Sequence, residues 1–350
     1  MDENLIGNIL GSLINRDNDC GMGGGNGAWW IIILLLFFTG GFGGFGMNRG
    51  LAAPATQQDV AAGFNFNQLD NGIRGLERGM CQLGYDNLAQ ANGINMNVNA
   101  QGDAPTCSTI TNTFAANNYD LILANATPAL LAAISSTSSI PILGTSVTDY
   151  ATAMEIDEWT GVTGTNVSGT SDLAPLDQQA ACIKELFPDA KNIGILYCSA
   201  EPNSKYQATV ITEYLEKDGY TVTEYKFSDS NDVASVTQAA ADANDVLYIP
   251  TDNTAASCTE AIANVVIPAK VPVFAGEEGI CAGCGIATLS ISYYDLGRAT
   301  GDMAYEILVN GADPASMEIE FAPNVTKKYN AANAEALGIT IPDDYEAIEE

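Results

Sequence analysis

The sequence contains no histidine, and its basic residues are few. Without an imidazole group, the chain has no Ser-His-Asp or Cys-His catalytic arrangement and no histidine-based zinc site. The 13 Lys and Arg residues stand against 43 Asp and Glu, which gives a formal net charge of −30. Proteins that bind nucleic acid use clusters of Lys and Arg to neutralise the phosphate backbone. We therefore expect no nucleic-acid partner.

Reactive groupings of other kinds are missing as well. The sequence shows no nucleophile–base pair and no cluster of metal-ligating residues. The glycines of GGFGGFG (40–46) lack the preceding strand and the following helix that a nucleotide-binding loop requires. We expect neither an enzyme nor a cofactor.

Cysteine is thinly spread, with eight residues in a chain of 350, so no compact disulfide framework is expected. Only Cys281 and Cys284 are close together, in the motif CAGC. This motif lies in a glycine-rich stretch before an expected strand, whereas a thioredoxin-type site needs it at a strand-to-helix turn. No second CxxC is present to complete a zinc site. The motif favours a structural pair or a local disulfide.

The sequence has no apolar run of the length that a membrane-spanning helix needs, about 20 residues. Its longest run, Trp29–Phe38 (WWIIILLLFF), has glycine-rich, uncharged flanks. Membrane contact through this run stays open, with the paired tryptophans as interfacial anchors. Four acidic residues and Arg16 alone precede the run, and Cys20 follows Asn-Asp, so there is no convincing signal peptide or lipobox.

From Gly93 onward, short apolar runs alternate with segments of helical spacing, which predicts an α/β fold with parallel sheets. Expected strands lie at 95–100, 120–125, 140–143, 193–197, 221–227, 246–249, 271–275, 287–291 and 317–321. Residues 151–171 are Gly- and Thr-rich and are expected to be an irregular crossover. Two similar α/β units joined by crossovers describe a hinged binding protein, although a single large sheet fits the same spacing.

The stretch Asp245–Thr259 (DVLYIPTDNTAASCT) has the pattern of a strand, a tight turn and a helix start. Val246–Ile249 is the apolar strand, and Asp252 and Asn253 are capping residues in front of a helix-forming run. One interpretation is plain capping and turn chemistry. The other is a ligand site: helix-start amides attract a carboxylate, and a nearby Asp neutralises an ammonium group, a combination that suits a zwitterion.

Residues 92–350 resemble the substrate-binding proteins of ABC importers, in the family that includes tryptophan- and tyrosine-binding members. The matching blocks are NVNAQGD (97–103), DLILANATPAL (120–130), IPILGTSVTD (140–149), NVSGTSD (166–172), IKELFPDAKNIGILY (183–197), DVLYIPTDNT (245–254), VPVFAGEEG (271–279), ISYYDLG (291–297) and ALGITIP (336–342). The segment 1–91 resembles small uncharacterised phage and prophage proteins of Gram-positive bacteria. The chain thus looks like a fusion of two pieces.

The resemblance implies a type I periplasmic-binding fold, in which two α/β lobes close on a ligand about a hinge. It predicts an N-terminal lobe at 92–165, a C-terminal lobe at 166–320 and a returning segment at 321–350. It also implies an aromatic amino acid as ligand, an ABC permease as partner and a location on the extracellular face of the membrane.

Carried over by position, the resemblance predicts ligand-binding residues at the carboxyl ends of strands in both lobes. From the first lobe these are Gln101, Asp103, Thr127, Pro128, Thr145, Thr148 and Asp149, and from the second Thr251, Asp252, Asn253, Thr254, Gly276, Glu277, Tyr293 and Tyr294. Turn chemistry is an alternative role for the acidic residues Asp103 and Asp149. Core packing is the alternative for the two tyrosines.

One departure from the family pattern concerns the first strand, which is normally central in a doubly wound sheet. Leu69–Tyr85 has the spacing of the helix that follows this strand, but the residues before it do not read as a strand. We therefore expect an N-terminal lobe without its first strand. The flanking strands then close up, another segment fills the gap, or the lobe forms poorly. The last case corresponds to an alternative function, a non-binding fusion protein associated with phage or membrane.

Overall fold

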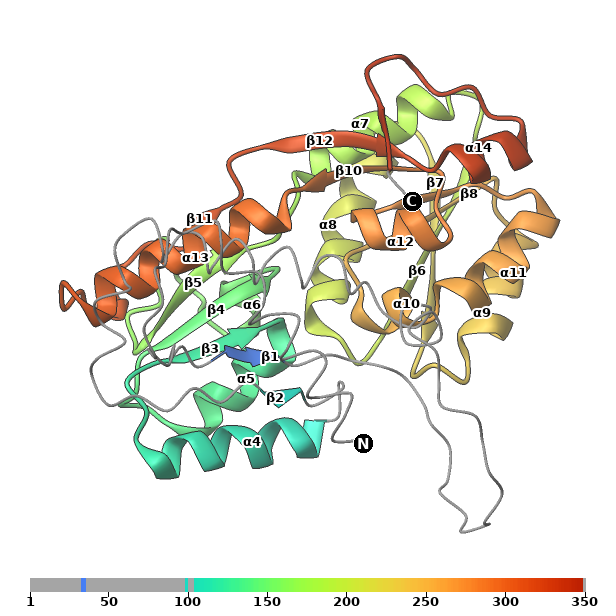
Figure 1. Ribbon diagram of the computed structural model, residues 1–350. Coiled ribbons are helices and arrows are strands. Elements are labelled where there is room, and N and C mark those ends of the chain that lie inside the picture. The colour runs from blue at the N-terminus through green and yellow to red at the C-terminus, as the bar shows by residue number, and fades with distance from the viewer. Residues whose placement is uncertain (1–32, 36–97, 100–103, 349–350) are drawn as a thin grey trace, which may run out of the picture.

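The computed structural model describes residues 33–35, 98–99 and 104–348, and they form two α/β lobes side by side (Figure 1). Each lobe is built on its own sheet with helices packed against it. The α/β class expected from the alternating pattern is therefore confirmed, and two sheets are present rather than one.

The N-terminal sheet has six strands, all paired in parallel, in the order β11-β5-β4-β3-β1-β2. The strands are β1 (Ile33–Leu35), β2 (Val98–Asn99), β3 (Ile122–Asn125), β4 (Ile142–Val147), β5 (Val167–Ser171) and β11 (Glu320–Phe321). The helices of this lobe are α4 (Ala104–Asn117), α5 (Thr127–Ser136), α6 (Tyr150–Ala153) and α13 (Tyr293–Leu308). The helix α13 packs on β4 and β5, and α5 packs on β3 and β4.

The C-terminal sheet has seven strands in the order β13-β12-β10-β9-β8-β6-β7, and only the β10–β12 pair is antiparallel. Its strands are β6 (Asn192–Cys198), β7 (Thr221–Phe227), β8 (Val246–Ile249), β9 (Val273–Ala275), β10 (Ala287–Ile291), β12 (Val325–Tyr329) and β13 (Glu346–Ala347). Its helices are α7 (Leu176–Leu186), α8 (Pro202–Lys217), α9 (Val233–Ala241), α10 (Asn253–Ser257), α11 (Thr259–Ala269), α12 (Glu278–Gly283) and α14 (Ala331–Leu337). A short 3-10 helix, η2 (Pro314–Ser316), lies in the segment that leads back to β11.

The expectation that the N-terminal lobe lacks its first strand is wrong. Ile33–Leu35 fills the position between β2 and β3, and Leu34 pairs with Val98 on one side and Ala124 on the other. Of the three alternatives left open, another segment fills the gap. An uninterrupted aliphatic run is the pattern of a parallel strand covered on both faces, so the sequence around β1 is suited to this position. The other residues of Trp29–Phe38, the segment Leu69–Tyr85 and the predicted site residues Gln101 and Asp103 lie outside the described residues.

Within the described residues 104–348, the chain crosses between the lobes three times. It passes from β5 to α7 through 172–175, from β10 to α13 at Ser292, and from β11 to β12 through 322–324. The sheets therefore divide the chain differently from the expected boundaries: β5 and α13 lie within 166–320 and β11 begins at its last residue, yet all three belong to the N-terminal lobe. Residues 151–171 are also more regular than expected, since they include most of α6 and all of β5.

Small residues allow β5 to pack closely although its sequence reads as a loop. A Cβ atom at Gly169 would collide with the carbonyl oxygen of Gly144 and with the Tyr150 hydroxyl, and its φ is +145°. Tyr150 is fully buried and donates a hydrogen bond to the carbonyl oxygen of Thr170 at 3.2 Å. Every residue of β5 is buried despite its polar composition.

The CAGC motif lies in and after α12, not in a loop as expected. Cys281 and Cys284 are buried free thiols, so the observed arrangement is the structural pair and not the local disulfide. In the described part of the chain, no helix has the length and apolar character that crossing a bilayer would require.

Replacing Leu34 by Pro tests whether β1 completes the sheet. Proline removes one backbone donor from a central strand, where each amide is paired, and we expect the free energy of unfolding to fall by about 1–3 kcal/mol. Denaturant unfolding measures this loss, and amide exchange at Ile122–Asn125 should become faster. Leu34→Val keeps the backbone donor and is the matched control. Unchanged unfolding and exchange in Leu34→Pro would contradict the assignment of β1.

Candidate functional site

The carboxyl ends of β3, β4 and β5 lie next to one another at one edge of the N-terminal sheet. After β3 the backbone turns sharply through Ala126, whose φ is 76°, and α5 begins at Thr127 with Pro128 in its first turn. The Ala126 amide donates to the carbonyl oxygen of Thr145 at 2.9 Å, which holds the two strand ends together. Among the residues that the structure describes, no side chain caps the start of α5. The helix therefore presents an amide end at this edge of the sheet.

The predicted residues at the end of β4 point in different directions. The Thr145 hydroxyl accepts from Thr170 at 3.2 Å and from Thr300 of α13 at 3.1 Å, so it joins β4 to β5 and α13. Asp149 caps α6 by accepting from the Thr152 amide at 2.7 Å. Thr148 is buried, and its carbonyl oxygen accepts from the Ser171 hydroxyl at 2.7 Å. Thr145 and Asp149 thus have local structural partners, whereas Thr148 lies beside the end of β5.

Asp252 caps the N-terminus of α10 in the C-terminal lobe. One carboxylate oxygen of Asp252 accepts from the Ala255 amide and the other from the Cys198 amide, each at 2.7 Å. The side chain is only 1% exposed. Burial, reinforced by the charge of Glu201, raises the pKa of Asp252 to about 8, while its amide donors lower it. This is the arrangement that the capping interpretation predicts.

Glu201, which sequence reasoning missed, completes this cap. One of its carboxylate oxygens accepts from the Thr254 amide (2.8 Å) and hydroxyl (2.7 Å). The other accepts from the amide (3.0 Å) and the side-chain nitrogen (2.7 Å) of Asn253. The Thr251 amide donates to Gln207 at 3.1 Å. The polar groups of this turn are therefore used within the lobe, and we do not assign Asp252 as the partner of a ligand ammonium group.

Gly276 and Glu277 follow β9 toward the crossovers. A Cβ atom at Gly276 would lie 2.8 Å from backbone atoms of Pro250 and Thr251, so glycine allows the ends of β8 and β9 to approach. Glu277 is 3% exposed and caps α12, accepting from the amides of Gly279 and Ile280. Burial raises the pKa of Glu277 to about 7, with further upward contributions from Glu278 and Asp172.

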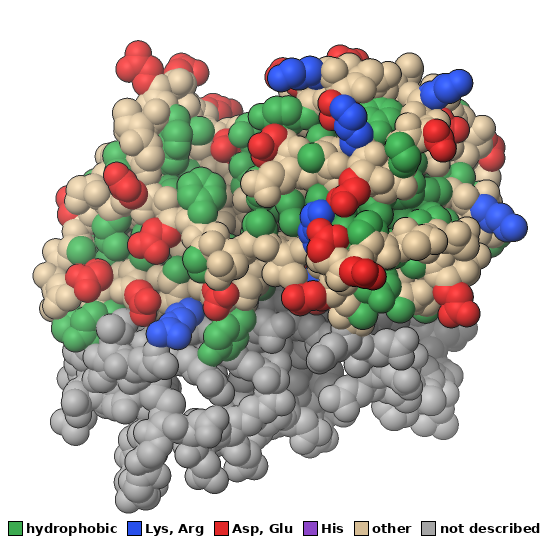
Figure 2. All heavy atoms as spheres, turned by 90° about the horizontal axis from the view of Figure 1, so that it is seen from above, with side chains coloured by type: hydrophobic (Ala, Val, Ile, Leu, Met, Phe, Trp, Pro, Cys, Tyr) green, Lys and Arg blue, Asp and Glu red, His purple; other side chains and the backbone are tan. Residues whose placement is uncertain are grey.

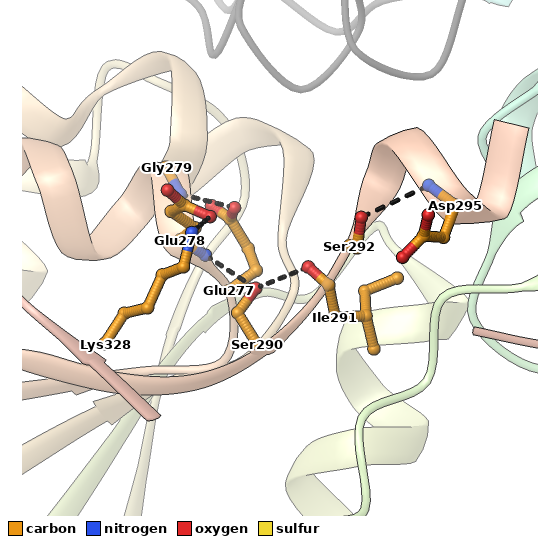
Figure 3. A network of polar contacts seen from close by, with 8 residues as sticks. All are labelled: Glu277, Glu278, Gly279, Ser290, Ile291, Ser292, Asp295 and Lys328. Atoms are coloured by element: carbon orange, nitrogen blue, oxygen red, sulfur yellow. Dashed lines mark hydrogen bonds and ion pairs between the residues drawn. The ribbon is translucent and has the colours of Figure 1, made fainter. Parts of the chain in front are cut away.

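Figure 3 shows the surroundings of Glu277 at the crossover from β10 to α13. The Glu278 amide donates to the Ser290 hydroxyl at 3.2 Å, and the Glu278 carboxylate pairs with Lys328 at 2.8 Å. Ser292 caps α13 by accepting from the Asp295 amide at 3.2 Å. Polar and acidic side chains therefore line the crossover from β10 to α13.

Asp172 stands where β5 ends and the first crossover begins. It is 4% exposed, and one carboxylate oxygen accepts from the hydroxyl of Tyr293, the first residue of α13, at 3.1 Å. The other oxygen, Oδ1, is buried and has no hydrogen-bond partner in the described part of the chain. Burial raises the pKa of Asp172 to about 6, whereas hydrogen bonding to the Thr148 and Tyr293 hydroxyls lowers it.

The sequence carried a signal for Asp172, because NVSGTSD ends in an acidic residue at a strand end. It was overlooked because 151–171 reads as an irregular crossover. The structure therefore brings the predicted residues Thr148, Glu277 and Tyr293 together with Asp172, while Thr251, Asp252, Asn253 and Thr254 form a separate cap. Tyr294 is partly buried at the start of α13. No three His, Cys, Asp or Glu side chains within the described ranges converge as metal ligands would.

Basic side chains are few on the face of the molecule shown in Figure 2. On the face shown in Figure 2, Lys and Arg stand apart from one another among more numerous Asp and Glu. Lys328, the described basic residue that reaches the acidic side chains of α12, is already paired with Glu278. Asp172 has no ion-pair partner among the described residues.

Known proteins with related sequences and structures share this architecture. A tyrosine-binding protein of Clostridioides difficile is 36% identical over 243 residues, or 69% of each chain. The structure of an ABC domain from Streptococcus pneumoniae in complex with L-Trp has a TM-score of 0.76 at 29% identity, covering 91% of this chain and all of that one. A ligand-free, open substrate-binding protein with adhesive properties from Clostridium difficile has a TM-score of 0.63 at 34% identity, covering 81% and 95%.

The family match extends over most of the chain. The family model described as ABC transporter substrate binding protein matches residues 59–348. The match thus begins within the segment 1–91 that was expected to be phage-like, and the phage resemblance has no support among these relatives. The family consists of binding proteins and is not a class of enzymes. The chain belongs to the ABC transporter substrate-binding proteins.

Proposed function

We propose that this protein is the solute-binding component of an ABC importer and binds an aromatic amino acid between its lobes, with Asp172 as partner of the ligand's ammonium group. The observation that carries the proposal is the buried Oδ1 of Asp172, which has no hydrogen-bond partner among the described residues. A buried polar atom without a partner is costly, and such a site in a binding protein is most simply completed by a ligand. An ammonium group supplies both the missing donor and the opposite charge.

The start of α5 is suited to the ligand's carboxylate. No described side chain caps it, and it belongs to a helix of ten residues, long enough to carry a partial positive charge at its N-terminus. Only β4 separates β3 from β5, so Thr127 and Asp172 stand at strand ends about 10 Å apart, twice the spacing of neighbouring strands. An amino acid with one hydrogen bond at each end fits this span.

The aromatic preference rests on two relatives, one named for tyrosine binding and one solved with L-Trp. Tyr293 and Tyr294 at the start of α13 are the described aromatic side chains that we assign to the ring. The lobes also meet in a manner suited to enclosing a ligand: α6 packs against α8, and the charge of Asp149 acts on Tyr206 of α8. Among the relatives above, the fold is more similar to the L-Trp complex than to the ligand-free, open protein.

The permease partner and a location on the extracellular face follow from the same family membership. Membrane contact through Trp29–Phe38 remains a proposal, and it competes with the use of Ile33–Leu35 as β1. The alternative of a non-binding fusion protein rested on an incomplete first lobe. It loses that support because β1 fills the position between β2 and β3.

Asp172→Asn tests the ammonium partner. We expect the affinity for L-tryptophan, L-tyrosine and L-phenylalanine to fall at least about 30-fold, because removing one member of a buried charge pair costs about 2–5 kcal/mol. Isothermal titration of the full chain measures the change. Tryptamine and indole-3-propionate, which lack the carboxylate and the ammonium group respectively, should each bind more weakly than tryptophan. Wild-type protein that binds none of the three amino acids would contradict the proposal.

Asp252→Asn is the matched variant for the second candidate carboxylate. The amide can accept one hydrogen bond but leaves the second buried amide unpaired, so we expect the free energy of unfolding to fall by about 1–3 kcal/mol. Amino-acid affinity should stay within about threefold of wild type, since the cap makes no contact with the proposed ligand. Thermal unfolding and titration measure the two effects. A loss of affinity as large as that of Asp172→Asn would restore Asp252 as a ligand-binding residue.

A further inference from the structure

We propose that Asn203, at the start of α8, accepts a hydrogen bond from the ring of the ligand, so that the site prefers aromatic amino acids whose ring carries an N–H or O–H group. This inference rests on the proposed function of the same site. It concerns which aromatic amino acids are bound, and it predicts discrimination against phenylalanine, whose ring has no hydrogen-bond donor.

Hydrogen bonds fix the orientation of the Asn203 amide. Asn203 is the second residue of α8 and is 4% exposed. Its side-chain nitrogen donates to the carbonyl oxygen of Thr251 at 3.0 Å, and to side-chain oxygens of Glu201 and Ser204 at 3.3 Å each. The opposite orientation would place the amide oxygen against the Thr251 carbonyl oxygen, which accepts hydrogen bonds but does not donate them. The nitrogen therefore points into the lobe, and Oδ1 is the end of the amide that is left over.

The left-over oxygen lacks a donor. Oδ1 of Asn203 is buried and has no hydrogen-bond partner among the residues that the structure describes. Gln207, one turn further along α8, shows the complete arrangement: its nitrogen donates to the carbonyl oxygens of Asn203 and Thr251, and its oxygen accepts from the Thr251 amide, each at 3.1 Å. Because a buried amide oxygen without a donor is costly, a ligand that supplies the donor gains affinity.

Asn203 lies where the C-terminal lobe faces the N-terminal lobe. It follows the carboxyl end of β6, and Thr251 follows the carboxyl end of the neighbouring strand β8. The helix α8 packs against α6, and Figure 1 shows α8 on the side of its lobe that is nearest the N-terminal lobe. Burial, and next the charge of Asp149, raise the pKa of Tyr206, so the carboxylate that caps α6 lies near the second turn of α8. The buried oxygens without partners in Asp172 and Asn203 therefore belong to opposite lobes, each beyond the carboxyl end of a strand.

The chemistry of the two oxygens divides the ligand's donors between them. An amide oxygen only accepts, so the ligand must supply a donor, either its ammonium group or a group on its ring. The ammonium group is assigned to Asp172, because a carboxylate provides the opposite charge and a neutral amide does not. The ring donor is then the group left for Asn203. Two relatives are named with a ligand, tyrosine in one case and L-Trp in the other, and both ligands have such a donor.

The experiment compares ligands that differ in the ring donor alone, by isothermal titration of the full chain. L-Tyrosine has the phenol O–H that L-phenylalanine lacks, and L-tryptophan has the indole N–H that benzothienyl-L-alanine replaces with sulfur. We expect the wild-type protein to bind the ligand with the donor at least about fivefold more tightly in one pair or both, because the other ligand leaves the buried oxygen unpaired. In Asn203→Ala this preference should fall below about twofold, mainly through weaker binding of the ligand with the donor.

Gln207→Ala is the matched control. It removes an amide side chain that holds the same Thr251 backbone, but both ends of that amide are already paired within the lobe. Loosening of this turn should weaken both ligands of a pair alike, so the preference should stay at its wild-type value. A loss of preference as large as that of Asn203→Ala would overturn the inference, because the effect would then belong to the turn and not to Oδ1.

The outcomes separate this inference from the proposed function. Equal binding within both pairs by the wild-type protein, or a preference that Asn203→Ala retains, overturns the inference and leaves the function standing. Failure of the wild-type protein to bind tryptophan, tyrosine or phenylalanine contradicts the function itself.

A measurement on the wild-type protein decides the matter if Asn203→Ala does not fold. The side-chain carbonyl carbon of Asn203 should change its NMR chemical shift when the ligand with the donor binds, because accepting a hydrogen bond polarises the carbonyl group. The ligand without the donor should leave this resonance where it is in the empty protein. Equal shifts with both ligands of the preferred pair would overturn the inference.

Discussion

The constraint on which the site depends is the cost of removing a carboxylate from water. Asp172 is held at the end of β5, where the chain leaves one sheet for the other, and only one of its oxygens has a partner within the described residues. Because the side chain is buried, water does not solvate its charge as it does for a carboxylate on the surface. The hydroxyls of Thr148 and Tyr293 lower the cost of its charge, but burial outweighs them. A protein that keeps such a group gains from a partner that arrives from solution.

In the C-terminal lobe, buried carboxylates are stabilised by hydrogen bonds from the lobe itself. Asp252 and Glu201 are as deeply buried as Asp172, yet their oxygens accept from amides, hydroxyls and side-chain nitrogens of the same lobe. These carboxylates stabilise a helix start of five residues and tie it to β6. Asp172 and Asp252 both follow strands, but they differ in the number of hydrogen-bond donors that the protein supplies to each carboxylate.

Periodicity and turn chemistry predicted much of the fold. The strands at 221–227, 246–249 and 287–291 have the expected bounds, because apolar runs between turn residues have few other structures open to them. The strand β5 was missed because four of its five buried residues are Ser, Thr or Gly, and its packing depends on Gly144 of the neighbouring strand and on Tyr150. Asp252 carried a strong capping signal, but its second hydrogen bond comes from Cys198, far away in sequence. Such distant partners are not encoded in local spacing.

The place of β1 in the sheet has a consequence for how the chain folds. Ile33–Leu35 is synthesised before both of its neighbours, β2 and β3, which lie beyond residues 36–97. An aliphatic segment must therefore wait for distant partners while a long stretch is translated. Pairing of this kind raises contact order, slows folding and leaves apolar strand-forming sequence exposed to aggregation. Completing the first lobe is thus a late event in synthesis, and a chaperone that shields the nascent segment would favour it.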